Sequence, residues 1–270
     1  MLTMSGFTAF NPTYKFITVL MPTDLSNQII LITGAGRGLG QHAAHHLAKC
    51  GAIVGAADID PKTCQETVAD IRREGGKAYA YCGDMSDRDT YMEIAARFAG
   101  VSGRIDCIIN NAMLLRYEPI ADIRTDVLDK MLAIGVNAVI WGAQALLRHY
   151  DPERGGNIIN MASPVVHRGY PNTAVYSAVK GAVVALTKVM ATELGPRRIR
   201  VNAVSPASVP TPGAIGMVSK EEYARRAATI PLRRIGREED NSNAIAFLLS
   251  DEASFINGEV LNVDGGAAIS

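Results

Sequence analysis

The stretch "LITGAGRGLGQ" (residues 31–41) places a glycine-rich turn between a short apolar run and an amphipathic segment. In a parallel α/β fold, the helix that starts here presents unpaired N–H groups and the positive end of its dipole to a phosphate. The common spacing G-x-G-x-x-G fails, because Leu39 stands where the third glycine belongs. The spacing T-G-x-x-x-G-x-G is met by Thr33, Gly34, Gly38 and Gly40. Alone this is a weak signal, since a plain tight turn has the same composition.

Apolar runs and segments of helical period alternate along the rest of the chain. The runs cover residues 29–33, 52–58, 78–84, 105–110, 157–163, 199–205 and 259–264. The amphipathic segments lie near 38–50, 61–75, 86–100, 124–150, 172–195 and 238–250. Nearly continuous apolar runs are typical of parallel strands that are covered on both faces. The pattern therefore predicts a Rossmann-like, doubly wound α/β fold with about seven parallel strands and helices on both faces.

No linker or change in composition divides this pattern. We expect one domain over residues 25–270, preceded by an N-terminal extension at 1–24. Asp60 before Pro61 reads as an N-cap followed by a proline in the first helical turn. Residues 206–235 interrupt the alternation and are interpreted as a mobile lid over the substrate.

Composition narrows the function. The 27 basic and 27 acidic residues balance, so no net charge favours nucleic acid or anionic lipid. We found no apolar stretch of the roughly 18 residues that cross a bilayer, so no membrane partner is expected. The cysteines form no C-x-x-C pair, which favours buried free thiols, a reducing compartment and a cytoplasmic location.

A metal site is not expected either. His42 and His46 have the i, i+4 spacing of metal ligands, and His45 lies between them. No H-E-x-x-H arrangement joins them, so exposed helix positions explain these histidines better.

An acidic residue after the second predicted strand bears on the choice of cofactor. Asp58 lies eighteen residues beyond Gly40, where a carboxylate can accept hydrogen bonds from ribose hydroxyls. The same charge opposes a 2′-phosphate, whereas Arg37 in the glycine turn could bind one. Because the acid acts at the ribose itself, we expect NAD rather than NADP.

A serine, a tyrosine and a lysine suggest proton transfer. Tyr176 and Lys180 would lie one turn apart on one face of a helix, and Ser163 ends the fifth predicted strand. Hydride transfer to or from a carbinol carbon needs a proton moved at its oxygen. A phenol can move it if a nearby ammonium lowers its pKa from about 10. Ser163 would hold the substrate oxygen. Y-x-x-x-K alone is common on helix surfaces, so the joint occurrence carries the hypothesis.

Taken together, the motifs resemble the short-chain dehydrogenase/reductase family from about residue 25 to the end. They are "TGAGRGLG", Gly83-Asp84, "NNA" at 110–112, Asn137 in "GVNAV", Ser163, "YSAVK" and the terminal "NVDGG". The resemblance implies a catalytic tetrad of Asn137, Ser163, Tyr176 and Lys180. It implies cofactor contacts from Gly34, Arg37, Gly38, Leu39, Gly40, Asp58, Asp84, Met85, Asn111, Ala112, Tyr176, Lys180, Pro206, Val209 and Thr211. Asn137 would support a water relay to Lys180, Asp84 would contact the adenine, and Asn110 and Asn111 would support the cofactor and the sheet.

Two departures from the family pattern concern the substrate. Met113 replaces the glycine of "NNAG", and Ala207 replaces the glycine of the "PG" turn. We expect an apolar substrate cavity lined by Met113, Pro164, Val165, His167, Tyr170 and Ala207. Its walls favour a hydrophobic or alicyclic alcohol or ketone as the small-molecule partner.

The leading hypothesis is an NAD-dependent alcohol dehydrogenase or ketone reductase. An NADPH-dependent ketoreductase of the 3-oxoacyl type is the alternative that Arg37 favours and Asp58 disfavours. A non-catalytic nucleotide-binding scaffold and a non-redox enzyme on the same fold are further alternatives. The resemblance also implies a homotetramer or homodimer built from the long helices near 124–150 and 172–195.

Overall fold

A single parallel sheet organises the computed structural model, which describes residues 23–212 and 218–269. Its strands are β1 (Ile29–Thr33), β2 (Ile53–Asp58), β3 (Lys77–Cys82), β4 (Cys107–Asn110), β5 (Gly156–Met161), β6 (Ile199–Pro206) and β7 (Val260–Val263). Their spatial order is β3-β2-β1-β4-β5-β6-β7, and each neighbouring pair is parallel. The predicted doubly wound fold is confirmed, and each strand begins and ends within two residues of its predicted run.

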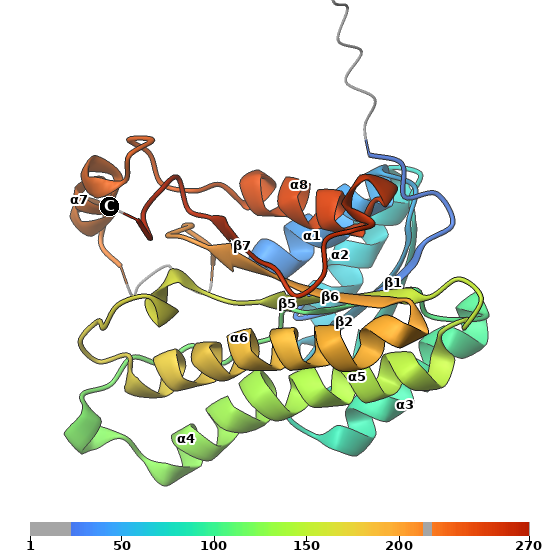
Figure 1. Ribbon diagram of the computed structural model, residues 1–270, viewed down its shortest axis with the longest axis horizontal. Coiled ribbons are helices and arrows are strands. Elements are labelled where there is room, and N and C mark those ends of the chain that lie inside the picture. Colours follow the sequence, from blue (N-terminus) through green and yellow to red (C-terminus); the bar gives the residue numbers. More distant parts are fainter. Residues whose placement is uncertain (1–22, 213–217, 270) are drawn as a thin grey trace, which may run out of the picture.

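Helices cover both faces of the sheet (Figure 1). On one face lie α1 (Gly38–Lys49), α2 (Pro61–Arg73) and α8 (Glu238–Leu249). On the other lie α3 (Arg88–Ser102), α4 (Thr125–Leu132), α5 (Ala138–His149) and α6 (Ala174–Leu194). Two apolar cores result, one on each face, because every strand except the edges is buried on both sides. All six predicted helical segments are present.

Helix α2 begins where its sequence predicts. The Asp60 carboxylate accepts hydrogen bonds from the backbone N–H groups of Lys62 and Thr63, and Pro61 occupies the first turn. The acid thus satisfies donors that the helix itself leaves unpaired.

The long apolar segment near 124–150 is one rod with a π-helical turn at Ala133–Asn137, between α4 and α5. This rod and the helix of residues 174–197 are both long and apolar enough to cross a membrane by length and composition. The expectation that no stretch reaches this length was therefore wrong. Both helices pack along the sheet beside each other, which accounts for their apolar composition (Figure 1).

The lid region contains a helix that was not predicted, α7 (Lys220–Thr229). Its start has a sequence signal, S-x-x-E, and the Ser219 hydroxyl accepts a hydrogen bond from Glu222 N at 3.1 Å. Residues 1–22 of the proposed extension and residues 213–217 of the proposed lid lie outside the described residues.

The cysteines differ partly from expectation. Cys64 and Cys107 are buried, Cys50 is half-buried and Cys82 is exposed; all four are free thiols. Burial raises the pKa of Cys64 to about 11, which keeps this thiol protonated at neutral pH.

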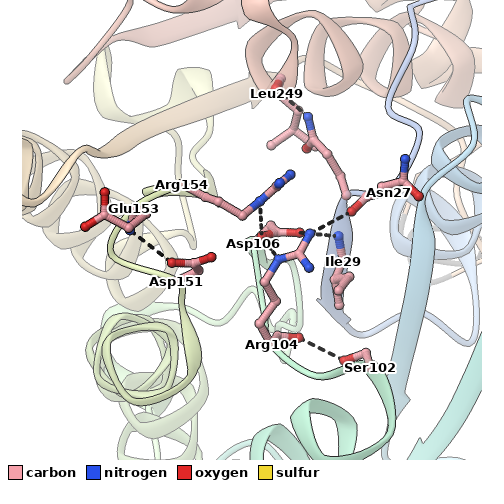
Figure 2. A network of polar contacts seen from close by, with 10 residues as sticks. Asn27, Ile29, Ser102, Arg104, Asp106, Asp151, Glu153, Arg154 and Leu249 are labelled. Atoms are coloured by element: carbon pink, nitrogen blue, oxygen red, sulfur yellow. Dashed lines mark hydrogen bonds and ion pairs between the residues drawn. The ribbon is translucent and has the colours of Figure 1, made fainter.

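Opposite the edge where the glycine turn lies, a buried acid ties the starts of three strands together (Figure 2). Asp106 accepts hydrogen bonds from Ile29 N at 2.9 Å and from two nitrogens of Arg104 at 2.6 and 2.9 Å. Arg104 also donates to the Asn27 carbonyl, and Arg154 lies 3.8 Å from the same carboxylate. The network connects the segment before β1 with β4 and with the turn before β5.

Asp106→Ala should therefore destabilise the fold. It leaves a buried N–H and a half-buried guanidinium without their acceptor, so we expect the free energy of unfolding to fall by about 2–4 kcal/mol. Urea denaturation measures this change. Asp126→Ala is the matched control, because its pair with Arg124 is exposed and such pairs contribute little. Equal losses in the two variants would contradict the role given to Asp106.

Candidate active site

The glycine turn is a preformed cradle between β1 and α1. Gly34 and Gly38 have φ values of +66° and +58°, which side-chain-bearing residues rarely adopt. A Cβ atom on Gly40 would collide with the Gly34 carbonyl oxygen. Asn111, just after β4, donates from Nδ2 to the carbonyls of Thr33 and Gly34 at 2.9 and 3.0 Å. Backbone therefore approaches backbone closely here, as a pyrophosphate-binding turn requires.

The ends of β1 and β4 are joined by one hydroxyl. Thr33 Oγ1 accepts hydrogen bonds from Asn111 N and Ala112 N, both at 3.1 Å. These two strands lie side by side at the point where the chain reverses its direction of winding, and ligands of such folds bind there. Through these bonds Asn111 supports the cradle, as expected, and Ala112, which was expected as a cofactor contact, lies beside it.

The acid expected at the ribose lies beside this cradle. Asp58 is buried at the carboxyl end of β2, and its oxygens accept hydrogen bonds from Gly36 N at 2.8 Å and Asp60 N at 3.0 Å. Each oxygen keeps a lone pair for a further donor. Arg37 is exposed on the outer side of the turn. The turn and the carboxylate together fit the phosphates and ribose of a dinucleotide.

Three more residues were expected to contact the cofactor: Leu39, Met85 and Asp84. Leu39 packs against one apolar core and Met85 is buried in the other, and their expected cofactor contacts stay predictions. Asp84 accepts hydrogen bonds from Ser86 and lies 3.4 Å from Lys130 Nζ.

The segment after β6 closes over the cradle. Pro206 ends β6, Val209 is buried, and Thr211 N donates to the Val209 carbonyl at 2.8 Å. A Cβ on Gly38 would lie 3.2 Å from Thr211 Cβ, so this segment lies against the glycine turn. The expected cofactor contacts of Pro206, Val209 and Thr211 stay predictions.

The expected catalytic groups Ser163, Tyr176 and Lys180 come together. Ser163 follows β5, and α6 carries Tyr176 and Lys180 one turn apart. Lys180 Nζ is buried, donates to the Met161 carbonyl at 2.6 Å and lies 5.7 Å from the centroid of the Tyr176 ring. An ammonium with three donors and one described acceptor can still bind a ligand hydroxyl.

Burial shifts the two ionisable groups in opposite directions. It lowers the pKa of Lys180 to about 8. Burial also raises the pKa of Tyr176 to about 12. A hydrogen bond from Ser163 acts in the opposite direction, and the neighbouring Tyr117 adds to the increase. Burial therefore outweighs the groups that favour the phenolate, and the pKa of Tyr176 is raised where the sequence predicts a lowered one.

The fourth expected member of the tetrad lies in the π-helical turn. Asn137 ends the π-helical turn and is exposed, whereas Gly135 is buried in the same turn. A Cβ on Gly135 would collide with Val179, the neighbour of Lys180 on α6, and would approach Met113 Sδ to 3.1 Å. Gly135 therefore packs directly against α6. The expected role of Asn137 in a water relay to Lys180 stays a prediction.

Behind the site, a buried polar chain has a structural role. Tyr91 Oη donates to Asn110 Oδ1, Asn110 Nδ2 to Asn160 Oδ1 and Asn160 Nδ2 to Thr187 Oγ1, each at 2.9 Å. It links α3, β4, β5 and α6, which confirms that Asn110 supports the sheet.

The residues expected to line the substrate pocket differ in how far they are buried. Val165 is buried, and Met113, Pro164 and Ala207 are half-buried. His167 and Tyr170 are exposed on the loop before α6, and their expected contact with substrate stays a prediction.

One aromatic residue at the site was missed by sequence analysis. The Tyr117 ring packs edge-on against Tyr176, with centroids 5.7 Å apart and an interplanar angle of 78°. Tyr117 lies after β4 with no helical or strand period, so only the preceding "NNA" motif could have directed attention to it.

The histidines of α1 are half-buried instead of exposed, and His42 Nδ1 lies 2.8 Å from Ser242 Oγ. Within residues 23–212 and 218–269, no group of three or more His, Cys, Asp or Glu side chains is placed to hold a metal.

Comparison with known proteins agrees with this geometry. A family model described as Enoyl-(Acyl carrier protein) reductase matches residues 34–268. The 3-oxoacyl-[acyl-carrier-protein] reductase of Thermotoga maritima is 35% identical over 248 residues, 91% of this chain and 99% of that protein. The cyclopentanol dehydrogenase of Comamonas sp. is 34% identical over 243 residues, 90% of this chain and 97% of that protein.

The fold has a close counterpart among solved structures. A 7α-hydroxysteroid dehydrogenase in complex with NADH and 7-oxo glycochenodeoxycholic acid has a TM-score of 0.87 and 28% identity, covering 91% of this chain and 96% of that one. Together with the matched family model and the two relatives, this places the chain in the short-chain dehydrogenase/reductase family, NAD(P)-dependent oxidoreductases that act on CH–OH groups.

Proposed function

We propose that this protein transfers a hydride between NAD(H) and a secondary alcohol or ketone with a hydrophobic or alicyclic skeleton. The observation that carries the proposal is the meeting of Ser163, Tyr176 and Lys180 beside the glycine cradle. The cyclopentanol dehydrogenase and the steroid dehydrogenase act on alicyclic compounds by name, which supports this substrate class.

Each site residue has its own role in proton transfer. Bound nicotinamide would exchange the hydride with the carbinol carbon and bring a positive charge near the phenol in its oxidised form. Tyr176 takes the proton from the alcohol oxygen, or returns it to the ketone oxygen. Ser163 donates to that oxygen and orients it. Lys180 binds a ribose hydroxyl and favours the phenolate electrostatically.

Asp58 supports NAD over NADP. Its buried carboxylate lies where the adenosine ribose would bind, and two negative charges about 4 Å apart repel by about 1–4 kcal/mol, depending on the local dielectric. The second candidate function is an NADPH-dependent ketoreductase of the 3-oxoacyl type. The exposed Arg37 and the similarity to the reductase of Thermotoga maritima favour it.

We further propose that the enzyme is cytoplasmic. We also propose that it is a homodimer or homotetramer whose subunits meet through α5 and α6. Ile140 and Val189 on these helices are 37% and 59% exposed, as expected of apolar side chains that a second copy covers.

Tyr176→Phe should lower kcat at least about 100-fold, because the phenol that moves the proton is gone. Turnover is followed at 340 nm with cyclic, aromatic and aliphatic secondary alcohols. Tyr79→Phe is the matched control and should retain activity within a few-fold, because this phenol lies on the edge strand β3 beside Arg72, away from Ser163 and Lys180. Undiminished turnover by Tyr176→Phe would exclude this mechanism, and an equally large loss in the control would show that the loss is not specific to Tyr176.

Asp58→Ala should shift cofactor choice toward NADP by about ten-fold or more, since the repulsion of a 2′-phosphate is removed. The ratio of kcat/KM for NAD to that for NADP is the measurement. Arg37→Ala serves as the comparison and should leave the NAD value nearly unchanged. A wild-type enzyme that prefers NADPH would favour the 3-oxoacyl alternative instead.

Lys180→Met should abolish activity yet stabilise the fold. The folded-state pKa of about 8 lies below the ordinary lysine value of 10.5, so the unfolded chain binds more protons between these pH values. Wild-type stability is therefore lowest below pH 8 and rises as pH increases toward 10.5. We expect a gain of about 1–3 kcal/mol at pH 7 that shrinks over this window, measured by urea denaturation. A variant less stable than wild type at pH 7 would contradict this view of the buried amine.

A further inference from the structure

The strand β3 has a free outer edge. It stands at the end of the sheet order, and the described residues place no strand beyond it. Gly83 N, just after β3, donates to the Asp58 carbonyl of β2 at 2.9 Å. Alternate residues of a parallel strand direct their backbone groups to the same neighbour, so Ala78 and Ala80 direct theirs away from the sheet. Arg72 Nε donates to the Ala78 carbonyl at 2.8 Å, whereas the N–H and C=O of Ala80 have no hydrogen-bond partner among the described residues.

A groove of about 620 Å³ lies along this edge. We term it the edge groove. Ala80 of β3 lines it, with Val68 and Arg72 of α2 on one side and Arg97 and Val101 of α3 on the other. Helices α2 and α3 cover opposite faces of the sheet, so the groove crosses the edge from one face to the other. The Val101 side chain is apolar yet 58% exposed. An extended segment in the groove would pair with Ala80 and direct alternate side chains to the two faces.

The edge groove carries two arginines, and no acidic residue of the described chain lines it. The guanidinium carbon of Arg72 lies 5.6 Å from the centroid of the Tyr79 ring, and that of Arg97 lies 5.5 Å from the centroid of Tyr81. Nη1 and Nη2 of Arg72 have no described acceptor. Arg97 pairs with Glu93 at 3.6 Å, and this pair is exposed. Exposed pairs of this kind contribute little, so both guanidinium groups are available to an incoming anion.

The spacing of the two cations matches a strand. Tyr79 and Tyr81 are two residues apart on β3 and pack into the same apolar core, so their rings share one face of the sheet. The cations that lie over these rings would therefore meet side chains two residues apart on a paired strand. The residue between those two would face α2, where Val68 lines the groove. The complementary sequence is thus acidic, apolar, acidic.

Two other occupants fit this charge less well. Residues 1–22 contain one lysine and no acidic residue, so this segment would bring a further positive charge to the groove. A second copy of the chain that paired through the same edge would bring arginines against arginines, and like charges across paired strands are destabilising.

We infer that the edge groove binds an extended acidic segment of a partner protein. The segment pairs with β3 through the backbone of Ala80 and places two carboxylates, two residues apart, on Arg72 and Arg97. The inference does not depend on the proposed hydride transfer. None of the groove residues lies on α5 or α6, the helices of the proposed subunit interface.

Synthetic peptides test this inference with the full-length protein, by fluorescence anisotropy. The probe is a labelled peptide of sequence Thr-Val-Glu-Val-Glu-Val-Thr, and its twin has glutamine in place of both glutamates. We expect the glutamate peptide to bind about ten-fold or more tightly than the twin, and less tightly at higher salt, because charge-assisted hydrogen bonds are made only with the carboxylates. A third peptide, N-methylated at its three central residues, keeps both charges but loses the strand's hydrogen bonds, so it should bind no better than the twin.

Variants of the protein place the peptide. Arg72→Gln and Arg97→Gln should each weaken binding of the glutamate peptide about five-fold or more. Arg73→Gln is the matched control, since it removes an equal charge from the same helix but Arg73 pairs with Asp70 and does not line the groove. Its affinity should stay within about two-fold of wild type. Thermal denaturation shows whether each variant is folded.

Amide hydrogen exchange followed by mass spectrometry gives a readout that needs no variant. Saturation with the glutamate peptide should slow exchange of the Ala80 N–H about ten-fold or more and leave β7, at the other end of the sheet, unchanged. Equal binding of the glutamate and glutamine peptides, equal losses in the Arg72 and Arg73 variants, undiminished binding of the methylated peptide, or binding without protection of β3 would each overturn the inference.

Discussion

All seven strands run in one direction, and this constraint determines where everything else can be. A parallel strand returns only through a crossover, so every strand-to-helix turn leaves from the same edge of the sheet. The chain changes its direction of winding between β1 and β4, and the turns after these two strands separate there. Thr33 and Asn111 hold the two turns together through one hydroxyl and one amide. The glycine cradle, Asp58, Ser163 and the start of α6 all follow from this geometry.

The site is built at a cost in stability. An ammonium in the interior is unfavourable unless it is hydrogen-bonded, and Lys180 has one described acceptor, the Met161 carbonyl. Its lowered pKa and the raised pKa of Tyr176 have the same cause, because burial disfavours the charged form of each group. A bound cofactor with a positive ring and ribose hydroxyls would relieve both effects. The amine and the phenol are thus arranged for a ligand more than for the fold.

The substrate side of the site is less apolar than its sequence suggests. Val165 is buried, whereas Tyr117, His167 and Tyr170 are exposed, and the Tyr117 ring lies edge-on against Tyr176.

The sequence by itself determined the strands and helices, because runs of Ile, Val and Ala between amphipathic segments are compatible with few other folds. It also determined that Tyr176 and Lys180 lie together, since helical spacing alone brings i and i+4 to one face. Tertiary structure decided the rest of the site. A π-helical turn interrupts the helix at Ala133–Asn137 and packs Gly135 against Val179 of α6, and no 3.6-residue period reveals this. Tyr117 and Tyr176 are 59 residues apart, and only the packing of the loop after β4 against α6 brings their rings together.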